Sequence, residues 1–251
     1  MKCLFGFMFI SVLAFGQAPI KCDDADCIAP LCENIEATLD LYDGDVISED
    51  YTGRNKSCYE NERLKELINY LNGKKHGAVL IYYESGQLKY RSAFVNGLED
   101  GLAMRYHENG NLSDIVNFFQ GQMDGELMSF FEDGTLDYSG VYQNGQLHGQ
   151  SIKNYPNGKA EYIQHFANGE QHGDFFKYYE NGQVQLITNL VNGVLNGEAM
   201  KFYENGKLEF TLTFVDGKEN GKTTYFNEDG SIHAIKEFDM GKLINCEGAC
   251  D

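Results

Sequence analysis

The sequence predicts an all-β fold: an elongated antiparallel β-meander solenoid of about eight two-stranded repeats, with a small disulfide-bonded N-terminal cap. Three observations predict it. A leading glycine recurs every 24 residues, apolar runs alternate with tight-turn dipeptides, and no cysteine lies between Cys58 and Cys246. A period of about 20 to 50 residues is typical of architectures in which each unit buries its apolar surface against its neighbours. The leading glycines are Gly53, Gly77, Gly101, Gly125, Gly149, Gly173, Gly197 and Gly221.

Residues 1–16 have the layout of a secretory signal peptide. Lys2 precedes an apolar run from Leu4 to Phe15, which is too short to span a membrane, and small residues follow it. Cleavage is expected after Gly16. We therefore expect an exported protein, located in the periplasm, at the cell surface or in the medium; a buried N-terminal strand is the alternative interpretation.

Residues 17–52 form a separate acidic segment that contains three cysteines. Apolar residues at helical spacing predict a short helix over about residues 31–42, which would cap the first hairpin. The acidic residues around Gly44 lack the alternating spacing of a calcium loop, so they are interpreted as a solvated loop.

Residues 53–244 hold eight copies of a two-stranded unit. In the copy from Gly77 to Asp100, a run ending in Tyr82 and Tyr83 precedes a Glu-Ser-Gly turn, and a longer run ends at an Asn-Gly turn. Glycine lacks Cβ and asparagine tolerates left-handed backbone, so both suit tight turns. About 16 antiparallel strands follow from this pattern. The structural turn glycines are predicted to be Gly77, Gly86, Gly97, Gly101, Gly110, Gly125, Gly134, Gly149, Gly158, Gly173, Gly182, Gly197, Gly206, Gly221 and Gly230.

Columns of equivalent residues identify the two faces, because side chains in a strand alternate between the sides of a sheet. The columns that begin at Leu80, Tyr82, Leu88 and Phe94 are apolar in nearly every repeat. We expect them to share one face, unless a bulge changes the parity between strands. A single layer cannot leave a long apolar face in water, so either the meander curls over this face or another molecule covers it.

The opposite side carries a column of rings beside a column of cations. One interpretation is that lysine and arginine stems lie over the rings, with cation–π contacts of ~0.5–1 kcal/mol each. The other is a partner-binding stripe, since tyrosine and arginine are enriched at interaction hot spots. The candidate binding residues are Tyr83, Arg105, His107, Phe131, Lys153, Tyr155, Lys177, Tyr179, Lys201 and Tyr203.

Repeat geometry argues against a metal site between repeats. Strands lie ~4.8 Å apart, so equivalent residues of neighbouring repeats lie ~10 Å apart. His148 and His172, which precede leading glycines as His76 does, therefore cannot share a zinc ion. Asp and Asn fill the same column, and their tolerance of left-handed backbone explains it. No metal or cofactor is expected.

Six cysteines remain after removal of the signal peptide, and an even number in an exported chain predicts three disulfides. Cys246 with Cys250 is the expected local pair in a C-terminal tail of residues 245–251. Cys58 is expected to tie an N-terminal cysteine to the first repeat. A zinc site is the alternative for the first four cysteines, although their spacing is wider than usual. The six are Cys22, Cys27, Cys32, Cys58, Cys246 and Cys250.

The mature chain is strongly acidic. Loss of residues 1–16 removes one basic and no acidic residue, which leaves 20 − 1 = 19 Lys+Arg against 38 Asp+Glu, a net charge of −19. Such a surface repels phosphate backbones and anionic lipid heads, so neither nucleic acid nor an anionic membrane is an expected partner. A row of turn acids could instead dock a basic partner: Glu60, Glu84, Glu108, Glu132, Glu180, Glu204 and Glu228.

The repeated unit resembles the MORN-repeat-variant family over about residues 53–244. The pattern G-x5-Y-E-N-G-x-L-x5-F-x-N-G-x3-G is seen in GDFFKYYENGQVQLITNLVNG and GEAMKFYENGKLEFTLTFVDG. Local departures are Glu62 in the first unit, Asn154 with Pro156 in the unit that begins at Gly149, and Asn227 in the last. The resemblance implies an elongated β-meander used as an interaction scaffold, and bacterial members of the family are often labelled antitoxin-like.

The expected function is that of a non-catalytic exported repeat scaffold, which mediates interaction with a protein or a surface polymer through exposed strand faces. The sequence contains no nucleophile elbow, paired metal motif or phosphate loop, so an enzyme is not expected. Two alternatives stay open: an antitoxin- or immunity-like protein that masks a basic partner, and a carbohydrate-binding module with rows of tyrosines. The partner's identity, the binding face and a homodimer through the apolar face also stay open.

Overall fold

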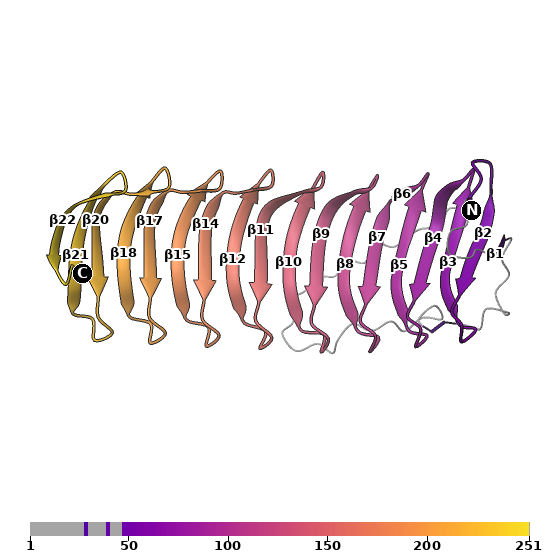
Figure 1. Ribbon diagram of the computed structural model, residues 1–251, viewed down its shortest axis with the longest axis horizontal. Helices are drawn as coiled ribbons and strands as arrows, with labels where there is room; N and C mark the ends of the chain where they lie inside the picture. Colours follow the sequence, from indigo (N-terminus) through magenta and orange to yellow (C-terminus); the bar gives the residue numbers. More distant parts are fainter. Residues whose placement is uncertain (1–27, 30–38, 41–46, 251) are drawn as a thin grey trace.

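A computed structural model of the chain describes residues 28–29, 39–40 and 47–250. In this part of the chain 22 strands form one open sheet, and no helix is long and apolar enough to cross a membrane. Figure 1 shows the strands side by side in sequence order, so the predicted all-β meander is confirmed. The predicted signal peptide, residues 1–16, lies outside the described residues.

Repeats 1 to 8 are numbered here by their leading glycines, from Gly53 to Gly221. The strands are β1 (Leu39–Asp40), β2 (Gly53–Cys58), β3 (Leu64–Leu71), β4 (Lys74–Tyr82), β5 (Leu88–Val95), β6 (Leu98–Glu99), β7 (Gly101–Tyr106), β8 (Leu112–Phe119), β9 (Gln122–Phe130), β10 (Leu136–Gln143), β11 (Gln146–Asn154), β12 (Ala160–Ala167), β13 (Glu170–Gln171), β14 (Gly173–Tyr178), β15 (Val184–Val191), β16 (Val194–Leu195), β17 (Gly197–Phe202), β18 (Leu208–Val215), β19 (Lys218–Glu219), β20 (Gly221–Phe226), β21 (Ile232–Asp239) and β22 (Lys242–Gly248).

Two kinds of turn join these strands. Asn96 and Gly97 both have positive φ, 52° and 89°, which is the geometry of a two-residue type I′ hairpin. At the other edge the Tyr83 amide donates to Gln87 O at 2.8 Å and the Gly86 amide donates to Tyr83 O at 2.9 Å, with only Gly86 at positive φ. The same two turns alternate along the array and fix one repeat length between them.

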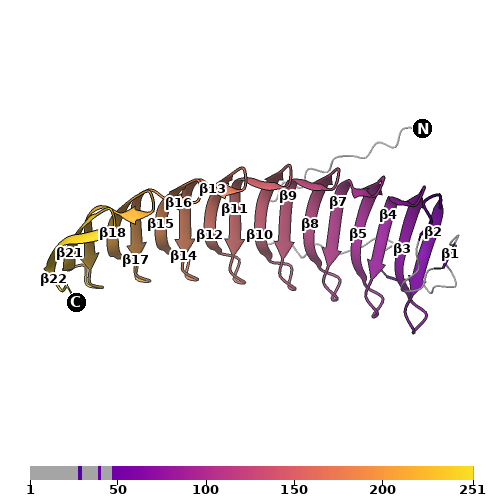
Figure 2. The same cartoon turned by 45° about the horizontal axis from the view of Figure 1, so that its top comes forward.

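The leading glycines lie at bulges or strand starts, and the prediction that they form turns was wrong. Gly77 lies inside β4 at φ 88°, where the register between β3 and β4 shifts. A bulge places unpaired residues on one strand and bends it, and glycine takes the required φ without strain. In four repeats the bulge splits one long strand in two, which adds four strands to the expected 16, and β1 and β22 bring the number to 22. Figure 2 shows two of the short pieces, β13 and β16, at the edge that is turned forward.

Strand register also corrects the predicted faces. Leu88 lies opposite Tyr82, whereas Phe94 lies opposite Gly77. Directly opposed residues share a face, and Tyr82 and Gly77 are an odd number of positions apart, so the Leu88 and Phe94 columns lie on opposite faces. The cause is Lys89, an extra residue that inverts the alternation between these two pairs.

The two sides are named here the Leu80 face and the Tyr90 face. Three apolar columns lie on the Leu80 face, and in repeat 2 their members are Leu80, Tyr82 and Leu88. The Tyr90 face carries the ring and cation columns, the Phe94 column and, between them, a row of small residues. That row includes Val79, Ser92, Ala103, Val116, Ser151, Thr188, Ala199, Leu212 and Thr223.

Burial differs between the two faces. The small-residue row of the Tyr90 face is buried along the whole array. Its end residues, Val79 and Thr223, are both 1% exposed. Larger side chains of the same face flank this row, so the Tyr90 face is closed by its own residues in every repeat. On the Leu80 face the fully buried apolar residues end at Met128 in repeat 4. Beyond repeat 4 the apolar columns of that face are partly exposed.

The two ends of the sheet are finished differently. β1 pairs in parallel with β2, so Leu39 and Asp40 form a strand where the sequence predicts the end of a helix. The edge of β2 offers unpaired backbone groups, and pairing with them outweighs the local helical pattern. The remainder of the predicted helix, and Cys22, Cys27 and Cys32, lie outside the described residues. Cys58 is disulfide-bonded.

The C-terminal tail is part of the sheet. β22 continues through Asn245 to Gly248, and Cys246 forms the expected disulfide with Cys250. Within the described residues no strand pairs with the outer edge of β22. The disulfide therefore closes the last turn of chain beside an open sheet edge.

Candidate functional site

The ring column of the predicted binding stripe forms a hydrogen-bond ladder between repeats. Each tyrosine hydroxyl donates to a carbonyl oxygen 23 residues further on, in the next repeat. The bonds run from Tyr83 to Tyr106 O (2.9 Å), Tyr155 to Tyr178 O (2.8 Å), Tyr179 to Phe202 O (2.8 Å) and Tyr203 to Phe226 O (2.7 Å). His107 Nε2 lies 2.9 Å from Phe130 O in the same arrangement, whereas Phe131 has no polar atom to offer.

This ladder gives the ring column a structural role that the sequence did not reveal. Burial raises the pKa of the Tyr83, Tyr155 and Tyr203 hydroxyls above the ordinary value of 10, so they ionise only at still higher pH than a free tyrosine. Their hydroxyl groups are committed to neighbouring repeats. A binding role for this column stays a prediction.

The turn acids are positioned by a second ladder. Asn109 Nδ2 donates to Glu132 O at 2.8 Å, and Asn157 Nδ2 donates to Glu180 O at 3.0 Å. The side-chain oxygen of Asn157 also accepts the Lys159 amide at 2.9 Å, which stabilises the turn itself. In four turns an asparagine thus holds the backbone of the next turn, while the glutamate side chains stay exposed; the four are Asn61, Asn109, Asn157 and Asn181.

The residues that directly precede the leading glycines are named here the cap residues, because their side chains lie at hydrogen-bonding distance from backbone amides of the turns. Asp100 and Asp124 accept hydrogen bonds from the Gln120 and Asn144 amides at 3.4 and 3.2 Å. His76 Nδ1 lies 3.5 Å from the Asn96 amide. None of the cap residues has positive φ, so the prediction that left-handed backbone explains this column was wrong. Its polar side chains instead bind the type I′ turn of the following repeat.

The cations of the predicted stripe lie on the Tyr90 face, and three of the four are paired with acids. Arg105 Nη1 lies 2.7 Å from Asp114 Oδ1, and Lys201 Nζ lies 2.9 Å from Glu209 Oε1. Lys153 Nζ lies 2.6 Å from an Asp137 carboxylate oxygen. Such partly exposed pairs contribute about 0–1 kcal/mol each, so they orient the cations more than they stabilise the fold.

Rings from the neighbouring strands lie beside these cations. Arg105 Cζ is 5.4 Å from the centre of the Tyr90 ring, and Lys201 Nζ is 5.8 Å from that of Phe210. Lys153 Nζ lies 5.9 Å from the Phe131 ring, as one of the two sequence interpretations expects. The sequence did not indicate the Tyr90 and Phe210 contacts, because they follow from strand register rather than from spacing along one strand.

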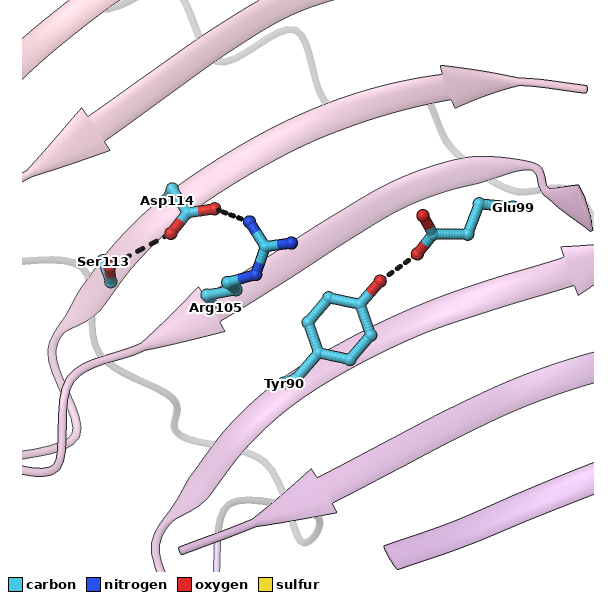
Figure 3. Close-up of polar contacts among 5 residues, drawn as sticks. All are labelled: Tyr90, Glu99, Arg105, Ser113 and Asp114. Carbon is cyan, nitrogen blue, oxygen red and sulfur yellow. Dashed lines mark hydrogen bonds and ion pairs between the residues drawn. The ribbon is translucent and has the colours of Figure 1, made fainter. Parts of the chain in front are cut away.

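Figure 3 shows a group of polar contacts on this face, in repeats 2 and 3. The Tyr90 hydroxyl donates to Glu99, and Ser113 Oγ donates to Asp114 Oδ2 at 3.0 Å beside the Arg105 pair. Burial, together with the hydrogen bond to Glu99, raises the pKa of Tyr90 to about 12. All the ionisable groups of this cluster have partners, so the arrangement holds the face rigid.

Lys177 differs from the other cations of the stripe. The residue eight positions after Lys201 is Glu209, its ion-pair partner, whereas the residue eight positions after Lys177 is Gln185. Among the described residues Lys177 makes neither an ion pair nor a cation–π contact. Within the same part of the chain, no three His, Cys, Asp or Glu side chains converge as a metal site would require.

The Leu80 face of repeats 5 to 8 presents a continuous, partly exposed apolar surface, named here the C-terminal strip. Ile232 is 59% exposed, whereas its repeat-2 equivalent Leu88 is 1% exposed. The sequence predicts the apolar columns but not where they are covered. The strip consists of Ile152, Ile163, Phe176, Tyr178, Val184, Ile187, Met200, Phe202, Leu208, Phe226, Ile232 and Ile235.

Comparison with solved structures adds little. The crystal structures of TcdB2-TccC3-Cdc42 and TcdB2-TccC3 are 12% and 11% identical to the chain, with a TM-score of 0.17 each. They cover 74% and 75% of this chain, which spans only 14% and 16% of theirs. A TM-score this low carries no argument about fold or function. No curated protein matches the sequence.

The repeats themselves match a known family. The family model of the MORN repeat variant matches residues 75–96, 99–120, 171–192 and 195–216. Each match covers one hairpin with its glycine-containing turn and ends at the first residue of the following type I′ turn. Four segments of the chain therefore match the MORN repeat variant, in agreement with the resemblance noted in the sequence.

Proposed function

We propose that the protein is a non-catalytic, exported repeat scaffold that binds another protein through the C-terminal strip. The observation that carries this proposal is the contrast along one face: the same apolar columns are buried in repeats 2 and 3 and partly exposed in repeats 5 to 8. Contiguous apolar surface rimmed by polar residues is typical of protein interaction sites.

The rigidity of the array supports this proposal. From repeat 5 to repeat 8 a tyrosine hydroxyl joins each repeat to the next, so the strip is held in a fixed shape. A preorganised surface loses less conformational entropy on binding. Export is supported by the Cys246–Cys250 disulfide and by the bonded Cys58, since disulfides persist in oxidising compartments.

The other candidate functions receive less support from the geometry. Carbohydrate binding was predicted from the rows of tyrosines, but the hydroxyls of Tyr155, Tyr179 and Tyr203 are occupied by backbone carbonyls. On the Tyr90 face Arg105, Lys153 and Lys201 are paired with acids rather than converging on an open site. Masking of a basic partner fits the acidic residues beside the strip and is developed below.

Photo-crosslinking tests the proposal and identifies the face. A photoreactive phenylalanine analogue is introduced at Phe202 on the Leu80 face or at Phe210 on the Tyr90 face. The mature oxidised protein is then irradiated in its own cell envelope and medium. Both sites are partly exposed aromatic positions of repeat 7, so they are matched in size and location. We expect one defined protein adduct at Phe202 and little at Phe210.

The outcomes are distinct. Absence of a protein adduct at both positions would contradict the scaffold function. An adduct at Phe210 alone would retain the scaffold and reassign its binding surface to the Tyr90 face. Adducts of equal yield with many proteins at both positions would indicate non-specific contact and would also contradict the proposal.

A further inference from the structure

We propose that the C-terminal strip is a docking surface for an extended basic segment of another protein, in which apolar and basic residues alternate. This inference rests on the proposed function and adds the chemistry of the partner. It combines three features of the structure: the exposed apolar columns, the way in which the same face is covered in the N-terminal repeats, and the acids on both sides of the strip.

The N-terminal repeats show what kind of ligand the Leu80 face accepts. Ala29 packs into the apolar cluster of this face, together with Tyr82 and Leu88. Its amide donates to Gly86 O at 2.6 Å, and Ile28 forms an antiparallel bridge with Gln87. An extended segment therefore inserts a side chain among the apolar columns and bonds to the edge of a turn.

The same acceptor recurs beside the C-terminal strip. The carbonyls of Gly182, Gly206 and Gly230 are equivalent to that of Gly86, and the described residues make no backbone hydrogen bond to them. Each lies at the turn edge of a strip hairpin. The strip thus repeats the two elements that hold Ala29, an apolar column and a carbonyl acceptor, without an occupant from the described part of the chain.

Acidic residues border the strip on both sides. On the Leu80 face, Asp174 and Glu198 follow the leading glycines of repeats 6 and 7, and Glu237 lies opposite Lys222 in repeat 8. At the turn edge the exposed acids are Glu180, Glu204 and Glu228. The cations in these borders are Lys222, Lys159 and Lys207. The ammonium groups of Lys159 and Lys207 donate to Asn181 O at 2.7 Å and to Asp229 O at 3.1 Å.

The acidic borders favour a bound segment that carries basic residues. An apolar surface between two acidic rows is complementary to a segment whose apolar side chains are flanked by lysines or arginines. A second copy of this chain, with a net charge of −18, would bring acidic borders against acidic borders. Four repeats at ~10 Å each span ~40 Å, which is the length of about 12 extended residues.

Binding of a defined peptide tests the apolar part of the proposal. The probe is a fluorescent peptide of alternating lysine and valine, about 12 residues long. Ile187→Thr with Met200→Thr should weaken its binding to the mature oxidised protein about fivefold by removing apolar contact area. The neighbouring repeat already carries Thr211 and Thr224 at the equivalent positions, so the fold accepts this residue there. The reverse pair, Thr211→Ile with Thr224→Met, should strengthen binding.

Two matched charge variants test the borders. Glu180→Gln, Glu204→Gln and Glu228→Gln together should weaken binding about tenfold at low salt, because these acids flank the strip. Glu84→Gln, Glu108→Gln and Glu132→Gln remove the same charge from the same turn column in repeats 2 to 4, and should change binding less than about twofold. A peptide with glutamate in place of lysine should not bind.

Several results would overturn the inference. Equal losses in the two glutamate triple variants would mean that general acidity attracts the peptide. Unchanged affinity in the Ile187 and Met200 double variant would exclude the strip. A dimer in solution that the same double variant converts to monomer would assign the face to a second copy. If the crosslinked partner binds these variants as tightly as the unchanged protein, the scaffold function stands and the inference about the strip fails.

Discussion

Removal of three hydroxyl groups from the tyrosine ladder should destabilise the array measurably. The variant replaces Tyr83, Tyr155 and Tyr179 by phenylalanine, which keeps the rings and removes only the donors. Their hydrogen bonds to carbonyls of the next repeat measure 2.9, 2.8 and 2.8 Å. A hydrogen bond of this kind contributes ~1 kcal/mol net, and sites in different repeats act nearly independently, so we expect a loss of about 3 kcal/mol.

The chain offers a matched control for this experiment. Tyr138, Tyr162 and Tyr225 lie on the Tyr90 face, and none of their hydroxyls donates a hydrogen bond within the described residues. Their replacement by phenylalanine removes the same three atoms without breaking a ladder bond. We expect the control variant to lose less than about 1 kcal/mol in total.

Phe131 provides the reverse test. Phe131→Tyr would place a hydroxyl opposite Asn154 O, the ladder acceptor that has no donor of this kind. Urea unfolding of the oxidised protein, followed by circular dichroism and extrapolated to water, measures all three variants. Equal stabilities of the ladder and control variants, or a Phe131→Tyr protein that is clearly less stable than the parent, would refute the structural role of the ladder.

Three further predictions concern single features. Tyr90 should be among the last tyrosines to ionise in a spectroscopic titration, near pH 12, and Glu99→Gln should lower the pKa of Tyr90. Because the pKa of Tyr90 in the folded protein lies above the ordinary value of 10, the stability that Tyr90 contributes is present below pH 10 and is lost between pH 10 and about 12. Gly221→Ala should cost ~1–2 kcal/mol of unfolding free energy through backbone strain at φ 82° alone, since no atom lies within 4 Å of the added Cβ; Gly221→Asn should cost less. Alanine at both Cys246 and Cys250 should speed hydrogen exchange in β22 by removing a constraint worth about 2 kcal/mol, and should leave β14 to β18 unchanged, because each repeat contacts only its neighbours.

The sequence predicted the repeat register and the turn chemistry well. The turns at Asn96–Gly97 and at Gly86 could be predicted from local sequence, because these residue types adopt positive φ at low conformational energy. The Cys246–Cys250 pair was also predictable, since a short separation at the end of the chain leaves few alternatives. Local chemistry of this kind repeats in every unit, and so the period alone revealed the meander.

The candidate surface was less predictable. Lys89 is one extra residue in a bulge, yet it moves the Leu88 and Phe94 columns to opposite faces. Nothing in the sequence indicated that the ring column forms hydrogen bonds, because Tyr83 and Tyr106 are 23 residues apart. Only the stacking of repeats brings the Tyr83 hydroxyl to the Tyr106 carbonyl. Strand parity and contacts between repeats depend on pairing, which single-strand alternation does not describe.

By itself the sequence determined the all-β class, the repeat length, the positions of both turns and the acidic character of the chain, because these depend on residue types at short range. Only the tertiary structure decided which columns share a face, that the tyrosines join repeats, and where the apolar face is covered. The physical reason is that a bulge changes parity and a neighbouring repeat supplies hydrogen-bond partners. Both effects arise only when the strands are placed side by side, and the partial exposure of the C-terminal strip became visible only there.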